Sequence, residues 1–169
     1  VISLSAAVLL TACQAAAPPL ATVDHVDLDR FMGDWYVIAN IPTFIEKGAH
    51  NAVESYRLDD DGSIATTFTF RQGGFDGPEK QYEPRGFIRD RSSNAEWGMQ
   101  FVWPFKSDYR VIYLADDYST TVIGRNKRDY VWLMARSPEI SPDEYRRAMR
   151  SIERAGYDAD RIQAVPQRW

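Results

Sequence analysis

The chain has 169 residues and a formal net charge of −4, from 20 Lys and Arg residues against 24 Asp and Glu residues. The mild acidity, with no basic block, argues against nucleic acid as a partner, and the length suits one domain behind a leader. The single cysteine cannot form an internal disulfide, so burial and hydrogen bonding must stabilise the fold.

The first predicted element is a secretory leader over residues 1–12, with an apolar run that is too short for a membrane span of about 20 residues. Its end, Leu10-Thr11-Ala12-Cys13, resembles the lipobox of bacterial lipoproteins, in which cleavage before the cysteine leaves that residue acylated. The resemblance implies that Cys13 is a lipid anchor. Gln14 after it, rather than Asp, implies the outer membrane, with the domain facing the periplasm. A buried N-terminal helix is the alternative.

The uncharged stretch that follows Cys13 is typical of a linker, so we assign residues 13–25 to the lipidated cysteine and linker and residues 26–169 to the folded domain. Eight runs of β-branched and aromatic residues predict strands over 34–41, 50–58, 63–72, 82–90, 95–103, 109–116, 118–126 and 130–136. Their short links favour an eight-stranded antiparallel up-and-down β-barrel over two packed sheets.

One helix is predicted after the strands. Ser141, Pro142 and Glu144 form a capping-box pattern. Apolar residues then recur at helical spacing up to Gly156, a typical C-terminal stop. We therefore expect an amphipathic helix packed outside the barrel.

Three short motifs, in register, resemble those of the lipocalin family. Gly33-Asp34-Trp35-Tyr36 resembles the Gly-x-Trp motif of the first strand, Asp117-Tyr118 the turn between the sixth and seventh strands, and Arg136 the third motif. The resemblance covers about residues 26–167 and is greatest to bacterial outer-membrane lipocalins. It implies that Trp35 and Arg136 stack at the barrel floor, where a cation–π contact contributes roughly 0.5–2 kcal/mol, and that Gly33, Trp35, Asp117, Tyr118 and Arg136 have structural roles.

An eight-stranded barrel can hold one small ligand. Strand parity, extended through the family register, predicts a deep apolar cup. Its predicted ligand-binding residues are Ala39, Tyr56, Phe68, Phe70, Met99, Phe101, Trp103, Tyr113, Val122 and Trp132. Each inward aromatic side chain could equally be core filler. Arg71, Lys106 and His50 are expected near the mouth, as candidates for a headgroup or as solvated loop residues.

The favoured function is a carrier of fatty acids or lysophospholipids, tethered to a membrane through Cys13. The alternative is an envelope-maintenance lipoprotein that acts through protein contacts with a mostly filled barrel. No cofactor is expected and no metal-ligand spacing is present in the sequence. Catalysis is disfavoured because neither histidine is placed for a triad, although parity turns Glu54 inward. The sequence leaves the oligomeric state, including a homodimer, open.

Overall fold

The computed structural model describes residues 18–169, so the predicted leader and Cys13 lie outside the described residues. The strands are β1 (Gly33–Ile41), β2 (Ala49–Leu58), β3 (Ser63–Gln72), β4 (Glu79–Tyr82), β5 (Arg85–Asp90), β6 (Glu96–Val102), β7 (Phe105–Leu114), β8 (Thr120–Gly124), β9 (Val131–Ala135) and β10 (Gln163–Ala164). The helices are α1 (Leu28–Phe31), α2 (Pro142–Arg154) and the 3-10 helix η1 (Ala159–Arg161). Across residues 18–169, no helix has the length and apolar character needed to cross a membrane.

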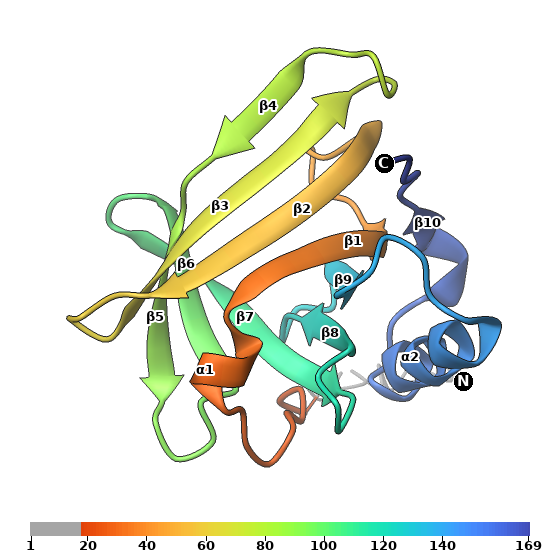
Figure 1. Ribbon diagram of the computed structural model, residues 1–169. Helices are drawn as coiled ribbons and strands as arrows, with labels where there is room; N and C mark the ends of the chain where they lie inside the picture. The colour runs from red at the N-terminus through yellow and green to blue at the C-terminus, as the bar shows by residue number, and fades with distance from the viewer. Residues whose placement is uncertain (1–17) are drawn as a thin grey trace, which may run out of the picture.

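The strands form one antiparallel sheet that closes into a barrel (Figure 1). Its order is β1-β2-β3-β5-β6-β7-β8-β9, and β9 pairs back with β1. Neighbours in the sheet are neighbours along the chain, which confirms the predicted eight-stranded up-and-down barrel. β4 and β10 are additions, because β4 pairs with β3 and β10 with β1.

One end of the barrel is closed by aromatic packing and a stacked arginine. Trp35, at the start of β1, is fully buried, and its Nε1 donates to the carbonyl of Phe31 at 2.9 Å. The Arg136 guanidinium lies 3.8 Å from the centroid of the Trp35 ring and donates to the carbonyls of Asp34 and Arg30 at 2.8 and 2.7 Å. We call this the closed end. The open end carries the loops β1–β2, β3–β4, β6–β7 and β8–β9.

The other two motifs also lie at the closed end. The turn between β7 and β8 contains Asp117 and Tyr118, and the Tyr118 hydroxyl accepts a hydrogen bond from the Asp27 backbone N–H at 2.9 Å. The Arg30 guanidinium lies 3.9 Å from the centroid of the Tyr118 ring. Gly33 begins β1 with φ +92°, a conformation in which any other residue would be strained. These contacts fasten α1 across the floor.

The predicted strand over residues 82–90 corresponds to β5, and the short strand β4, which was not predicted, precedes it. β4 pairs with the part of β3 near the open end, β5 pairs with the part near the closed end, and Pro84 lies between them. Proline has no backbone N–H to continue the ladder. The last pair between β5 and β6 is Arg85 with Gln100, and within the described sheet β4 pairs with β3 alone. The barrel wall is therefore unpaired between β4 and β6.

Helix α2 packs on the outer face of the barrel, as predicted (Figure 1). Ser141 and Glu144 form the expected capping box, in which the Ser141 Oγ accepts from the Glu144 backbone N–H at 3.2 Å. Ala148 and Ile152 of α2 are fully buried in an outer apolar cluster with Leu133 and other side chains of β1, β8 and β9. The protein thus has two cores: one inside the barrel and one beneath α2.

Candidate ligand-binding site

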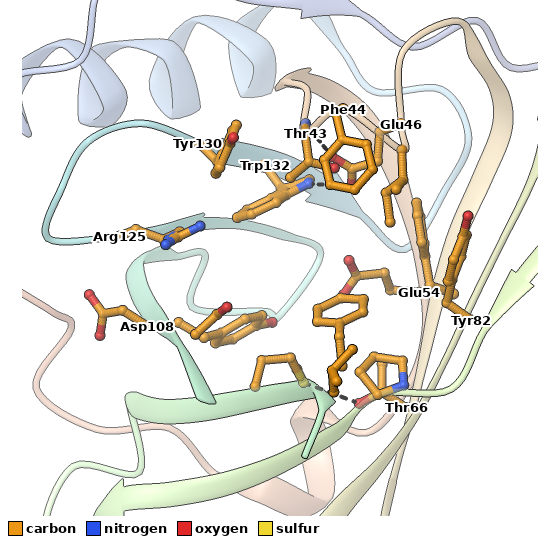
Figure 2. Close-up of a pocket in the computed structure, with 18 residues that line it drawn as sticks. Thr43, Phe44, Glu46, Glu54, Thr66, Tyr82, Asp108, Arg125, Tyr130 and Trp132 are labelled. Carbon is orange, nitrogen blue, oxygen red and sulfur yellow. Dashed lines mark hydrogen bonds between the residues drawn. The ribbon is translucent and has the colours of Figure 1, made fainter. Parts of the chain in front are cut away.

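A cavity of about 440 Å³ opens at the open end of the barrel. Ligand sites typically enclose 300–1,000 Å³, so the volume suits one small ligand. Four of the predicted residues line it: Phe68, Met99, Phe101 and Trp132. The other lining residues are Thr43, Phe44, Ile45, Glu46, Glu54, Thr66, Tyr82, Pro84, Val102, Ser107, Asp108, Tyr109, Arg125 and Tyr130 (Figure 2). The wall is mainly apolar, with a few polar groups among the aromatic rings.

Glu54 is one of the acidic side chains among these polar groups, and it points into the cavity from β2 (Figure 2). Burial raises the pKa of Glu54 to about 7, the hydrogen bond from Tyr56 opposes that rise, and repulsion from Glu46 adds to it. The Tyr56 hydroxyl also lies 2.8 Å from the Tyr109 hydroxyl. The carboxyl group is thus held by phenols, and no cation pairs with it among residues 18–169.

Glu46 is a second acidic lining residue, from the β1–β2 loop. It is 5% exposed, and burial raises its pKa. Its Oε1 accepts from the Trp132 Nε1 and its Oε2 accepts from the Thr43 backbone N–H, both at 2.8 Å. The bond from Trp132 ties the loop to the cavity wall, and the bond from Thr43 lies within the loop.

Arg125 supplies the positive charge at the opposite side of the cavity (Figure 2). It forms an ion pair with Asp129 at 3.4 Å, and its guanidinium carbon lies 5.2 Å from the centroid of the Tyr130 ring. Its Nε and the Thr43 Oγ1 are buried without a hydrogen-bond partner. Buried polar atoms are normally bonded to protein, water or ligand. The Arg125 Nε is nevertheless the atom that faces the Asp129 carboxylate in the ion pair.

Three predicted site residues face outward instead of inward. Ala39 and Val122 are buried in the outer cluster beneath α2, and Tyr113 packs against it. The predicted parity is wrong here for two reasons. Register shifts in β1, between Val37 and Ala39, and in β7, before Tyr113, reverse the side-chain alternation. In β8 the inward residue is Ile123, so the neighbouring Val122, which was predicted to face inward, faces outward.

Three further predicted residues are near the cavity without lining it. Tyr56 is buried beneath the cavity, where its hydroxyl serves Glu54 and Tyr109. Phe70 is 1% exposed, with its ring centroid 5.2 Å from that of Phe68. Trp103 lies in the turn between β6 and β7 and is 82% exposed, because the predicted strand 95–103 ends at Val102.

The charged residues expected at the mouth are occupied elsewhere. Arg71 forms an ion pair with Glu79 at 3.1 Å, and the Lys106 Nζ lies 3.5 Å from the centroid of the outward-facing Phe87 ring. His50 packs edge-on against Phe75. Glu46 was not predicted because it lies in a loop, where periodicity carries no information. Arg125 was not predicted because the expected strand over 118–126 ends at Gly124 in the structure, which leaves Arg125 in the β8–β9 loop. Over residues 18–169, no group of three His, Cys, Asp or Glu side chains is placed to hold a metal ion.

Comparisons with known proteins agree with this architecture. Residues 26–167 match the family model described as a lipocalin-like domain. The chain is 30% identical to outer membrane lipoprotein Blc of Escherichia coli (strain K12), covering 96% of this chain and 93% of that protein. It is 26% identical to temperature-induced lipocalin-1 of Arabidopsis thaliana, covering 88% and 83%. The solved structure of insecticyanin from Manduca sexta superposes with a TM-score of 0.69 at 15% identity, covering 88% and 84%.

Proposed function

Because this chain belongs to the lipocalin family, we propose that its cavity binds apolar ligands of the fatty-acid or lysophospholipid class. We also propose that Cys13 holds the protein at the outer membrane, with the barrel in the periplasm. Two relatives support the class of function: one is named an outer membrane lipoprotein and another, from Bos taurus, apolipoprotein D. In this proposal the protein stores or carries its ligand without chemical change.

The observation that carries the proposal is the vacant, mainly apolar volume above a filled floor. Burial of an alkyl chain gains about 0.8 kcal/mol per methylene, which can exceed the cost of association for a chain of a dozen carbons. The alternative of a mostly filled barrel that acts only through protein contacts is less well supported, because the cavity remains about 440 Å³.

The ligand class can be tested by organic extraction of purified protein followed by mass spectrometry. We expect a co-purifying acyl lipid, and displacement of a fluorescent fatty acid by that lipid. Ser107 lines the cavity, whereas Gln100 of the adjoining strand does not. Ser107→Trp should therefore block the fluorescent probe and Gln100→Trp should leave its binding intact. Absence of lipid, together with equal probe binding by both variants, would refute the proposal.

The anchor is tested separately by Cys13→Ala in the full chain with its leader. Multiple acyl chains make membrane attachment effectively permanent, so the substitution should remove the protein from the outer-membrane fraction. Retention of the Cys13→Ala variant in the outer membrane after washing with high salt would contradict acylation at this residue.

A further inference from the structure

We propose that the open end of the barrel docks on a lipid bilayer through an apolar rim, so that the cavity opens toward the membrane. The rim comprises Phe44, Phe101, Val102, Trp103 and Phe105. The inference rests on the proposed function for the identity of the cargo, but it concerns a different surface, which ligand binding in solution does not require.

The rim is exposed to a degree that is unusual for large apolar side chains. Phe44 is 83% exposed, Trp103 is 82% exposed and Phe105 is 75% exposed. Trp103 and Phe105 lie at the hairpin between β6 and β7, whose tip stands clear of the barrel wall (Figure 1). Contiguous exposed apolar side chains mark interaction sites, and aromatic residues favour the membrane–water interface.

The rim is continuous with the cavity. Phe44, Phe101 and Val102 each line the cavity as well as the surface. Tyr82 and Pro84 line the cavity at the part of the barrel wall where β4 does not pair with β6. An acyl chain can therefore pass between a bilayer at the rim and the cavity along apolar side chains, without crossing water.

The described part of the chain begins at this same end of the barrel. The Leu20 backbone N–H donates to the Asn126 side chain at 2.8 Å, and the Arg128 Nη2 donates to the Pro18 carbonyl at 3.1 Å. Both partners belong to the β8–β9 loop at the open end. Cys13 precedes Pro18 by five residues, which span at most about 18 Å. An anchor at Cys13 would hold the open end, rather than the closed end, close to the membrane.

Charge around the rim favours an anionic lipid surface. Lys47 and Lys127 are exposed in the β1–β2 and β8–β9 loops of the open end, whereas the Lys106 Nζ lies over the outward-facing Phe87 ring. The acidic residues of these two loops and of the β6–β7 hairpin are buried or paired: Glu46 bonds to Trp132, Asp129 pairs with Arg125 and Asp108 pairs with Arg110. In the fourth loop, Asp76 lies 3.6 Å from Arg168. Each lysine near an anionic surface adds to the attraction.

The test is co-sedimentation of residues 14–169, which lack the predicted leader and Cys13, with vesicles of phosphatidylethanolamine and phosphatidylglycerol. We expect the unacylated protein to bind these vesicles, and to bind vesicles of phosphatidylcholine more weakly. Adding Trp103→Ala and Phe105→Ala should weaken binding about tenfold or more, because each exposed aromatic loses its burial in the interface. The matched control is Leu58→Ala, an exposed apolar residue at the closed end, which should change nothing.

Two outcomes would overturn the proposal. One is equal vesicle binding by the double variant and the Leu58→Ala control. The other is a dimer in light scattering that the double variant converts to a monomer, with no vesicle binding by either form, because a second copy would then cover the rim. Binding of the fluorescent fatty acid in vesicle-free buffer tests the proposed function independently. The double variant should retain that binding, so failure of the two ideas can be told apart.

Discussion

Removal of the Glu54 carboxyl should make the stability of the protein less dependent on pH. The folded state holds the pKa of Glu54 at about 7, mainly through burial, compared with 4.5 ordinarily. Each pKa unit corresponds to about 1.4 kcal/mol, so the shift amounts to about 3 kcal/mol. Because the folded protein favours the protonated acid, this stability is fully present below pH 4.5 and is lost as the pH rises to about 7.

The assay is urea unfolding at about pH 5 and about pH 8. In wild type, Glu54 should cost about 2.5 kcal/mol across this interval, because part of its contribution is already lost at pH 5. Glu54→Gln keeps a hydrogen-bond acceptor for Tyr56 but does not titrate, so its loss of stability should be smaller by that amount. Glu46 titrates in both proteins, so its contribution is common to both apart from its repulsion with Glu54. Glu139→Gln, at an exposed site, is the matched control. Parallel losses in wild type and Glu54→Gln would refute the reasoning.

The same carboxyl group should make ligand binding depend on pH, because an alkyl chain beside Glu54 favours the neutral acid. Affinity for a neutral ligand such as a fatty alcohol, measured by probe displacement, should fall in wild type as the pH rises past about 7. In Glu54→Gln the affinity should stay level. Arg136→Ala removes the stack on Trp35 and three hydrogen bonds to backbone carbonyls, so the free energy of unfolding should fall by about 2–4 kcal/mol. An unchanged urea midpoint would show that the closed end does not need the guanidinium. Ser141→Ala removes the cap of α2 and should cost about 1 kcal/mol in the same assay, and no loss would mean that the outer core alone fixes the helix. Tyr113→Leu, at the outer face, should leave binding of the fatty-acid probe unchanged. A large loss of probe binding would show that Tyr113 faces the cavity.

The sequence was sufficient for the barrel, because each predicted strand is a short apolar run bounded by turn residues. The capped helix α2 was equally legible, since Ser141 and Glu144 form a local pattern that needs no tertiary information. Inward direction was predicted well where a strand is regular, as in β6, where Met99 lies inside as expected.

Prediction failed where the chain leaves a regular period. The register shifts that turn Ala39 and Tyr113 outward depend on how neighbouring strands pair, and no local residue pattern announces them. The roles of Glu46 and Arg125 depend on loop conformation, which places them against Trp132 and Tyr130 far along the chain. Polar groups of the cavity were therefore harder to predict than its apolar wall.

The segment from Pro18 to Val26 has a mechanical consequence. It lies along the barrel, with hydrogen bonds from Val23 to the Val111 carbonyl and from Val26 to the Ser93 carbonyl, at 2.9 and 2.7 Å. Leu20 is buried in the outer core. A force applied to the N-terminus would be borne by these attachments before it reached β1. The segment therefore protects the first strand of the barrel from tension.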